Sequence, residues 1–254
     1  MSYDACALLI KAGDPDRHLS AMAAPPEDRG ALMAIYALNL EIARAPWASP
    51  EPLVAQIRLQ WWADEIDKIY RGERVNSHEI LPALREVIFD HNLPQPLFIA
   101  LIEARQLDIY ADPPESMAAF DAYIEATSGS VMELAGRALG APEAALPILR
   151  DFAYGAGVAN LLRAAPALAA RGFSPLPLEV EKVVFAARRR LALARQQRAA
   201  IPKRLIPALR AGWRADAALK EAQKRPESIA NGLLEESPAW RRLSFQLRLW
   251  SGRW

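Results

Sequence analysis

Apolar residues recur along this chain at the spacing of an α-helix. In residues 53–72, Leu59, Trp62, Ile66 and Ile69 follow one another at intervals of three and four, which gives one apolar stripe. Alternation at period two is scarce, and good helix formers such as Ala, Leu, Arg and Glu dominate. The same periodicity predicts further helices over residues 27–44, 78–91, 95–110, 116–139, 143–170, 178–199, 203–222 and 237–250. The pattern therefore predicts an all-α fold.

The twenty prolines lie mainly between these predicted helices, where proline favours turns. No repeat of fixed period and no low-complexity linker divides the chain. The one candidate boundary lies near Pro175 and Pro177, where an acidic composition gives way to a basic one. We expect a turn at this point and a single domain over residues 1–254, with an acidic part (1–177) and a basic part (178–254).

The net charge of +1 hides an uneven distribution of charged residues. Residues 1–180 hold 14 Lys and Arg against 24 Asp and Glu, whereas residues 181–254 hold 17 against 6. A basic C-terminal third can meet an acidic partner, an anionic lipid or a nucleic acid, or it can neutralise the acidic part within the fold. No nucleic-acid-binding module accompanies the charge, so we expect no nucleic-acid partner.

Motifs of the common catalytic and cofactor sites are missing from the sequence. One cysteine, Cys6, excludes a disulfide framework, and the three histidines lack metal-ligand spacing. Neither a P-loop nor a dinucleotide-binding fingerprint occurs, so the sequence predicts no metal and no cofactor. A run of 18 uncharged apolar residues is also missing. We expect a cytoplasmic protein without a signal peptide, peripheral at most on the inner face of the membrane.

Five segments, in order, carry the motifs of a known family. They are DRHLSAMAAPPEDRGALMAIYA (16–37), IRLQWWADEIDKIYRG (57–72), LIEARQLDIY (101–110), YIEATSGSVMELAGRALG (123–140) and YGAGVANLLRAAPALAARGFSPLP (154–177). Together they resemble the squalene/phytoene synthase family of head-to-head prenyl synthases. The resemblance implies an isoprenoid-synthase-type helical bundle with a central cavity. In that family, two aspartate-rich motifs hold Mg²⁺ and the substrate diphosphates through hard oxygen ligands.

Both aspartate-rich motifs of that family fall on segments that lack aspartate here. Residues 29–50 hold one acid, Glu41, and residues 152–178 hold none. The second motif keeps its asparagine and arginine as Asn160 and Arg163. The resemblance places the five family aspartates on Ala43, Arg44, Trp47, Ala164 and Leu168, a family arginine on Leu40, and a family glutamine on Gly157. A Mg²⁺–diphosphate site without carboxylates would leave its charges unpaired, so we predict no prenyl synthase activity.

The segment LNLEIARA (38–45) resembles a non-catalytic branch of the same family, which carries F-N-x-E-L-A at this position. That branch includes a mitochondrial assembly factor of respiratory complex I. Its R-x-Q-[FW]-W helix is matched by residues 58–62. The resemblance implies a non-catalytic assembly factor for complex I, with a complex I subunit or assembly intermediate as partner. Two alternatives stay open: an isoprenoid- or lipid-binding protein that uses the emptied cavity, and a residual prenyl diphosphate transferase.

Several side chains would lie near the former active site if the fold is as expected. Glu41 could pair with an arginine and close the cavity; alternatively, Arg44 and Arg163 could bind an anionic head group without a metal. Within the helix over 53–72, the spacing of Arg58 and Trp62 suits stacking, and Trp61 could line the cavity. The candidate cavity contacts are Glu41, Arg44, Arg58, Trp61, Asn160 and Arg163.

Two C-terminal segments are basic and amphipathic. In residues 237–254, the apolar stripe consists of Trp240, Leu243, Leu247, Trp250 and Trp254. Such a segment could lie in a membrane interface or dock on the body as its last helix. Residues 180–198 combine an apolar stripe with a row of arginines in the same way. The candidate membrane or partner surface comprises Arg188, Arg189, Arg195, Trp240, Arg241, Arg248, Trp250 and Trp254.

Overall fold

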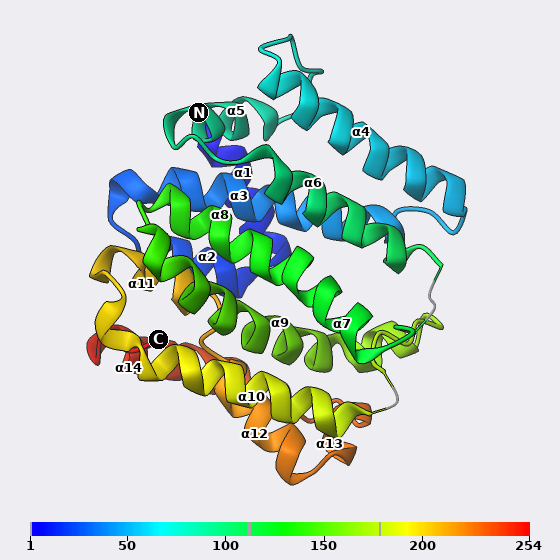
Figure 1. The fold of residues 1–254 in the computed structure, drawn as a ribbon, viewed down its shortest axis with the longest axis vertical. Coiled ribbons are helices and arrows are strands. Elements are labelled where there is room, and N and C mark those ends of the chain that lie inside the picture. Colours follow the sequence, from blue (N-terminus) through cyan, green and yellow to red (C-terminus); the bar gives the residue numbers. More distant parts are fainter. Residues whose placement is uncertain (1, 111–112, 178) are drawn as a thin grey trace.

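The computed structural model describes residues 2–110, 113–177 and 179–254, and within these ranges every regular element is helical, as predicted (Figure 1). The acidic part forms α1 (Ser2–Gly13), α2 (Pro15–Met22), α3 (Pro26–Arg44), α4 (Pro52–Tyr70), α5 (Leu81–Asp90), α6 (Gln95–Ala104), α7 (Met117–Ile124), α8 (Ser130–Ala138) and α9 (Leu146–Ala169). The basic part forms α10 (Val180–Gln196), α11 (Ile206–Arg210), α12 (Ala215–Lys224), α13 (Glu227–Ala230) and α14 (Pro238–Trp250). Single 3-10 turns cover Ala45–Trp47, Arg105–Asp108, Glu143–Ala145, Arg198–Ala200 and Lys203–Leu205, and a π-helical turn covers Glu125–Gly129.

Two central helices, α3 and α9, organise the packing. The first packs against α1, α2, α5 and α8, while the second packs against α8, α10, α12 and α13. Figure 1 shows α4 and α5 at one end of this stack and α10, α12 and α13 at the other. Both segments that resemble the aspartate-rich motifs therefore lie at the C-terminal ends of the central helices, at residues 40–47 and 157–168.

Two N-terminal helices, α1 and α2, were not predicted. Cys6 and Ile10 of α1 are fully buried, so this helix belongs to the core. The start of α2 is marked by Asp14, whose carboxylate accepts a hydrogen bond of 3.0 Å from the backbone N–H of Arg17. A cap followed by proline is a helix-start signal, and a search for apolar periodicity alone does not detect it.

The predicted helix over residues 203–222 is broken in the structure. α11 ends at Arg210, a turn follows, and α12 begins at Ala215. At this turn Gly212 lies directly on α9, because a Cβ there would stand 2.6 Å from the Ala156 Cβ. The predicted helix over 116–139 is interrupted in a similar way by the π-helical turn between α7 and α8. In both cases a close approach to α9 outweighs continuous helical periodicity.

Candidate functional site

The central space between α2, α3, α8 and α9 is nearly filled. It measures about 20 Å³ and is lined by Arg17, Tyr36, Ser128, Val131, Met132, Ala153, Ala156, Gly157, Asn160, Ala211 and Gly212. A void of about 10–15 Å³ already suffices for one water molecule. This space is thus about the size of one water molecule. The Tyr36 phenol on its wall is fully buried, and burial raises its pKa above the ordinary value.

Gly157 explains much of this closure. The resemblance assigns this position to a glutamine, but here the helix α9 carries no side chain. A Cβ on Gly157 would lie 2.6 Å from the Ser128 Cβ and 3.2 Å from the Ile124 Cγ2. The segment that carries Ile124 and Ser128 therefore occupies the volume that a side chain at position 157 would need.

Aromatic packing replaces carboxylates at the C-terminal end of α3. Trp47, on a position that the resemblance gives to an aspartate, meets Phe173 edge to face with ring centroids 5.3 Å apart. The Arg171 guanidinium also lies near this ring, 5.8 Å from the Trp47 ring centroid. Ala43 and Leu40 supply no oxygen ligand. These residues do not fit a Mg²⁺–diphosphate complex, which needs several carboxylate oxygens.

Glu41 and Arg44 form a loose pair within α3. Their closest nitrogen–oxygen distance is 4.0 Å, and the Arg44 side chain is half exposed. Its guanidinium lies over Gly13, at the C-terminal end of α1, where partial negative charge favours a cation. The structure thus places Glu41 beside Arg44, in one of the two arrangements that the sequence left open.

Arg163 belongs to a compact group of six charged side chains, which we call the Asp16 cluster. Its members are Asp16, Arg163, Arg214, Glu235, Glu236 and Arg241. Arg214 is only 4% exposed and lies at the centre, 3.1 Å from the Asp16 carboxylate, 2.7 Å from that of Glu235 and 3.2 Å from that of Glu236.

Arg163 reaches the edge of this cluster from α9. Its Nε donates to Glu235 over 2.8 Å, and its Nη1 donates to the Asn160 side-chain oxygen over 3.1 Å. The remaining Nη2 stands 3.6 Å from Asp16. The predicted alternative, in which Arg44 and Arg163 bind one anion together, is not supported, because each is committed to different neighbours.

The Asp16 cluster is electrically balanced, with three carboxylates against three guanidinium groups. Burial alone would raise the pKa of Glu235, but hydrogen bonds from Arg163 and Arg214 hold it below its ordinary value. Sequence reasoning missed four members of the cluster. No spacing rule connects positions 16, 214, 235 and 236, so no sequence signal was available for them.

The α4 candidates lie away from the central space. Arg58 is exposed, while Trp62 is buried with its ring 4.8 Å from that of Trp61 and 4.9 Å from that of His78. The predicted stacking of Arg58 on Trp62 is therefore wrong, and histidine and tryptophan rings take that place. Trp61 is half buried beside the same rings and does not line the central space.

One acid of α4 has a structural role that the sequence did not reveal. Three acids, Asp64, Glu65 and Asp67, lie close together on α4, where the sequence alone suggests a solvent-exposed face. In the structure, however, Glu65 is fully buried. Its carboxylate accepts hydrogen bonds from Lys68 over 2.7 Å and from the Asn76 backbone over 2.7 Å. Glu65 therefore fixes the loop after α4. Within the described ranges, no three His, Cys, Asp or Glu side chains gather in a way that could hold a metal ion.

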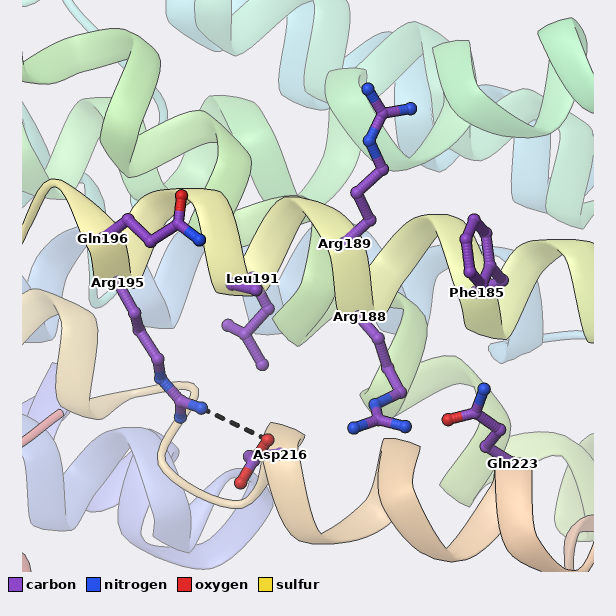
Figure 2. Close-up of a pocket in the computed structure, with 9 residues that line it drawn as sticks. Phe185, Arg188, Arg189, Leu191, Arg195, Gln196, Asp216 and Gln223 are labelled. Atoms are coloured by element: carbon purple, nitrogen blue, oxygen red, sulfur yellow. Dashed lines mark ion pairs between the residues drawn. The ribbon is translucent and has the colours of Figure 1, made fainter.

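A groove with a basic wall runs between α10 and α12 (Figure 2). It encloses about 490 Å³, and Arg188 reaches across it toward Gln223 of α12, whereas Arg189 points the opposite way. Arg195 is held by Asp216 at 3.2 Å, and Asp216 also contacts Lys220 at 2.9 Å. In the part of the chain that the structure describes, Arg188 and Arg189 form no ion pair.

The last helix, α14, has an inner and an outer face. Phe245 docks it on the body by packing edge to face on Trp213, with ring centroids 5.2 Å apart. Trp240, Leu243, Leu247 and Trp250 are exposed on the outer face, Trp250 at 79%. None of the helices that the structure describes combines the length and apolarity required for a bilayer span.

Three candidates for this surface face inward instead. Trp254 is 3% exposed and packs edge to face on Phe152 of α9, because Gly252, with φ +62°, turns the chain back toward the body. Arg241 points at Asp16 across 3.8 Å. Arg248 is largely buried, and burial together with the nearby Arg195 lowers its pKa. These three corrections share one cause: the arginines and Trp254 lie on the docked side of the segment.

Comparison with known proteins gives a consistent picture. The family model described as squalene/phytoene synthase matches residues 10–183. The chain is 33% identical over 190 residues to "NADH dehydrogenase (ubiquinone) complex I, assembly factor 6 homolog" of Drosophila melanogaster, covering 69% of this chain and 54% of that protein. It is 23% identical over 176 residues to assembly factor 6 of Bos taurus, with 69% and 53% covered. The chain thus spans about half the length of these curated relatives.

Solved structures agree on the fold. The squalene synthase HpnC from Alicyclobacillus acidocaldarius superposes with a TM-score of 0.75 at 16% identity, over 89% of this chain and 94% of that one. A dehydrosqualene synthase in complex with ligand superposes with a TM-score of 0.68 at 15% identity, over 98% and 95%. At such identities the likeness concerns the architecture, which is that of the isoprenoid-synthase-type bundle.

Proposed function

Because the chain belongs to the squalene/phytoene synthase family, we propose that it is a non-catalytic member that acts in the assembly of respiratory complex I. The observation that carries this proposal is the shared name of its curated relatives, which are called complex I assembly factor 6 in Drosophila melanogaster and Bos taurus. Its partner is then a subunit or an assembly intermediate of NADH:quinone oxidoreductase.

The closed centre supports a role without prenyl transfer. Where the resemblance expects metal-binding carboxylates, the chain has the Trp47–Phe173 contact on one side and Ala164 and Leu168 on the other. Arg163, the basic side chain kept from the second motif, is already neutralised in the Asp16 cluster. A diphosphate there would lack the carboxylate-held Mg²⁺ that compensates its negative charge in the family's sites.

An isoprenoid or lipid ligand in the centre is less well supported. A ligand pocket for a small organic molecule typically measures about 300–1,000 Å³, whereas the space between α3, α8 and α9 holds about 20 Å³. Opening it would require moving Ser128 away from Gly157 and Gly212 away from Ala156. The size of this space therefore argues against a ligand at this point between α3, α8 and α9.

The outer face of α14 supports a position at the membrane surface. Trp240 and Trp250 flank the exposed leucines Leu243 and Leu247, and exposed Arg242 adds positive charge beside them. A helix with tryptophans and arginines around an apolar stripe suits the interface of an anionic membrane. We propose that this face rests on the cytoplasmic surface of the membrane that holds complex I.

The assembly role is tested by deleting the gene in its own organism and measuring NADH:quinone oxidoreductase activity in isolated membranes. We expect a selective loss of this activity, with succinate oxidation unchanged, and recovery on expression of the wild-type chain. Recovery with Asn160→Ala is expected too, because this exposed side chain makes its one hydrogen bond among the described residues to Arg163. Unchanged activity in the deletion strain would refute the assembly role.

The lack of catalysis is tested separately with purified protein, farnesyl diphosphate and Mg²⁺. We expect no release of pyrophosphate above the protein-free rate, and any protein-dependent release would contradict a non-catalytic role. Membrane contact is tested by co-sedimentation with phosphatidylglycerol vesicles. Trp250→Ser should weaken sedimentation, whereas Leu53→Ser, an exposed apolar residue on α4, should leave it unchanged. Equal effects of the two substitutions would argue against an α14 contact.

A further inference from the structure

Three adjoining hollows along α10 form one continuous groove, which we call the α10 groove. The basic hollow of Figure 2 shares Phe185 and Gln223 with a second hollow of about 640 Å³. The second shares Val180, Pro226 and Ile229 with a third of about 670 Å³. The groove therefore follows α10 from its first residue to its last turn, with α12 and α13 as the opposite wall.

The two ends of the α10 groove differ in chemistry. Its far end is apolar and is lined by Ala165, Pro166, Ala169, Phe173, Pro175, Leu176, Val180 and Ile229. Its near end carries Arg188, Arg189 and Arg195 against a single acid, Asp216. Phe185 lies between the two ends and is 62% exposed.

The positive charge at the near end is available to a partner. Asp216 is shared by Arg195 and Lys220, which leaves Arg188 and Arg189 without an acid among the described residues. The neighbouring ring of Phe185 adds apolar surface beside them. An occupant must therefore offer carboxylates at one end and apolar side chains at the other.

The dimensions of the groove favour a helix over a lipid. α10 has 17 residues, which corresponds to a length of about 25 Å at about 1.5 Å per residue. Small ligands are usually enclosed over about 70–90% of their surface, whereas the three hollows are open to solvent. A helix laid into a groove buries one face and leaves the other in solvent, which suits an open trough of this length.

We propose that the α10 groove binds an amphipathic helix of a protein partner, with its acidic residues against Arg188 inside the groove and Arg189 on its outer rim, and its apolar residues against Phe185 and the far end. The identity of this partner as a complex I subunit or intermediate rests on the proposed function. The basic near end of the groove lies beyond residue 183, the end of the family match, whereas its far end includes Ala165 and Phe173 of the segment 154–177.

The binding test uses the full chain and defined helical peptides. The probe is a fluorescein-labelled 18-residue peptide with leucines on one face and glutamates toward one end; a second peptide carries lysines in place of the glutamates. Fluorescence anisotropy should show the acidic peptide binding on the order of tenfold tighter or more, because charge complementarity discriminates between them. Equal affinity for the two peptides would overturn the proposal.

Matched substitutions separate the groove from general charge. Arg189→Glu should weaken the acidic peptide by roughly tenfold, whereas Arg74→Glu, an exposed arginine after α4, should have little effect. Phe185→Ser should weaken binding as well, in contrast to Phe89→Ser on α5, whose ring is 49% exposed. If the groove and control variants behave alike, or if Phe185→Ser instead reduces binding to phosphatidylglycerol vesicles, the peptide groove is refuted.

Complementation distinguishes this inference from the proposed function. A deletion strain with normal complex I activity, together with peptide binding that requires Arg189 and Phe185, would refute the assembly role and leave the groove standing for another partner. A strain that loses complex I activity and regains it fully with the double variant Arg189→Glu, Phe185→Ser would refute the groove as the client site and leave the assembly role standing.

Discussion

Arg163 on α9 and Arg189 on α10 carry the same guanidinium group in opposite situations. Arg163 stands on a family motif position, yet the carboxylates of Asp16 and Glu235 already balance its charge. Arg189 stands on no motif, yet it is exposed and forms no ion pair with the described residues. Availability of a charge, and not its place in a motif, therefore indicates where this protein can meet a partner.

The same contrast holds for aromatic side chains. The rings of Trp47 and Phe173 pack against each other, whereas Phe185 lies exposed between two hollows. The space between α3, α8 and α9 is nearly filled, whereas an open trough runs along α10 on the outside of the molecule. We propose that the acidic and basic parts nevertheless form one domain, because the contact between α9 and α10 is the most extensive between any two described helices.

The strongest challenge to this comparison is to separate the parts. A fragment of residues 1–177 should fail to unfold cooperatively in urea, because it would expose the α10-facing side of α9 and leave Asp16 without Arg214. As urea is added, the circular dichroism and the tryptophan fluorescence of the fragment should each change gradually, and the two curves should not coincide. A sharp transition of the fragment, close to that of the full chain, would show two independent domains.

Removal of Arg214, the central cation of the Asp16 cluster, should lower the free energy of unfolding by a large amount. Arg214→Met leaves three acids around a neutral side chain, and breaking a buried ion pair in this way costs about 3–5 kcal/mol. Urea unfolding at pH 7 measures the loss. The control Arg225→Met removes an exposed ion pair with Glu221, which is worth about 0–1 kcal/mol. Similar losses for both would mean that the Asp16 cluster does not stabilise the closed site.

Restoring a glutamine at position 157 should strain the centre. Gly157→Gln forces a Cβ toward Ser128, and overpacking of a filled core costs about 1–3 kcal/mol. The double variant with Ser128→Gly should recover part of that loss. Ala167→Gln, at an exposed position on the same helix, should change the free energy of unfolding by less than about 0.5 kcal/mol. A neutral Gly157→Gln would mean that the centre has room to open.

Acidification should lower the free energy of unfolding, because it protonates carboxylates that are hydrogen-bonded in the folded state. Burial alone would raise the pKa of Glu235, Glu133 and Glu65, but hydrogen bonds from basic and amide groups lower each below the ordinary value of 4.5. The folded state then binds fewer protons than the unfolded one, so this stabilisation is fully present above pH 4.5 and is lost as the pH falls through the lowered values.

Urea titrations between pH 7 and pH 3 test this sign. The free energy of unfolding should stay level down to about pH 5 and then fall, since unfolded carboxyl groups take up protons first. Glu235→Gln should make the fall shallower than in the wild type, and Glu115→Gln, at an exposed position, should leave its slope unchanged. A stability that rises on acidification would contradict the lowered pKa values.

The smallest effect should come from the groove. Arg189→Glu changes an exposed, unpaired side chain, so the free energy of unfolding should shift by no more than about 0.5 kcal/mol. Thermal and urea unfolding measure it beside the peptide affinities. A large destabilisation would mean that Arg189 supports the fold, and the contrast with Arg163 would then disappear.

The helical fold was largely predictable from local pattern. α3, α4 and α14 begin within one residue of the predicted starts, because Pro26, Pro52 and Pro238 occupy first-turn positions ahead of periodic apolar residues. The exposed outer face of α14 also followed from the spacing of its tryptophans and leucines. Where a helix is amphipathic and its proline stands in the first turn, the sequence carries enough local information.

The candidate site was predictable only in part. Its motif positions came from the resemblance, but the Asp16 cluster joins residues whose numbers have no periodic relation, and only tertiary packing brings them together. In the sequence, the spacing of Trp254 extends the apolar stripe of α14. In the structure, the turn at Gly252 instead places the Trp254 side chain in the core. The arginines of α10 looked alike in the sequence. Arg190 is paired with Glu125 and Asp151, and Arg195 with Asp216, and all of these acids lie on other elements.

The Asp16 cluster also bears on how the chain folds during its synthesis. Asp16 and Arg214 are 198 positions apart, and Glu235 follows 21 positions after Arg214. A ribosome makes the carboxylate first and its counter-ions last, so the nascent protein keeps Asp16 and later Arg163 hydrated until nearly the whole described chain has emerged. Contacts between such distant residues form slowly, because a long loop must close before they stabilise anything. The whole cluster can therefore form only after the chain has been made as far as Arg241.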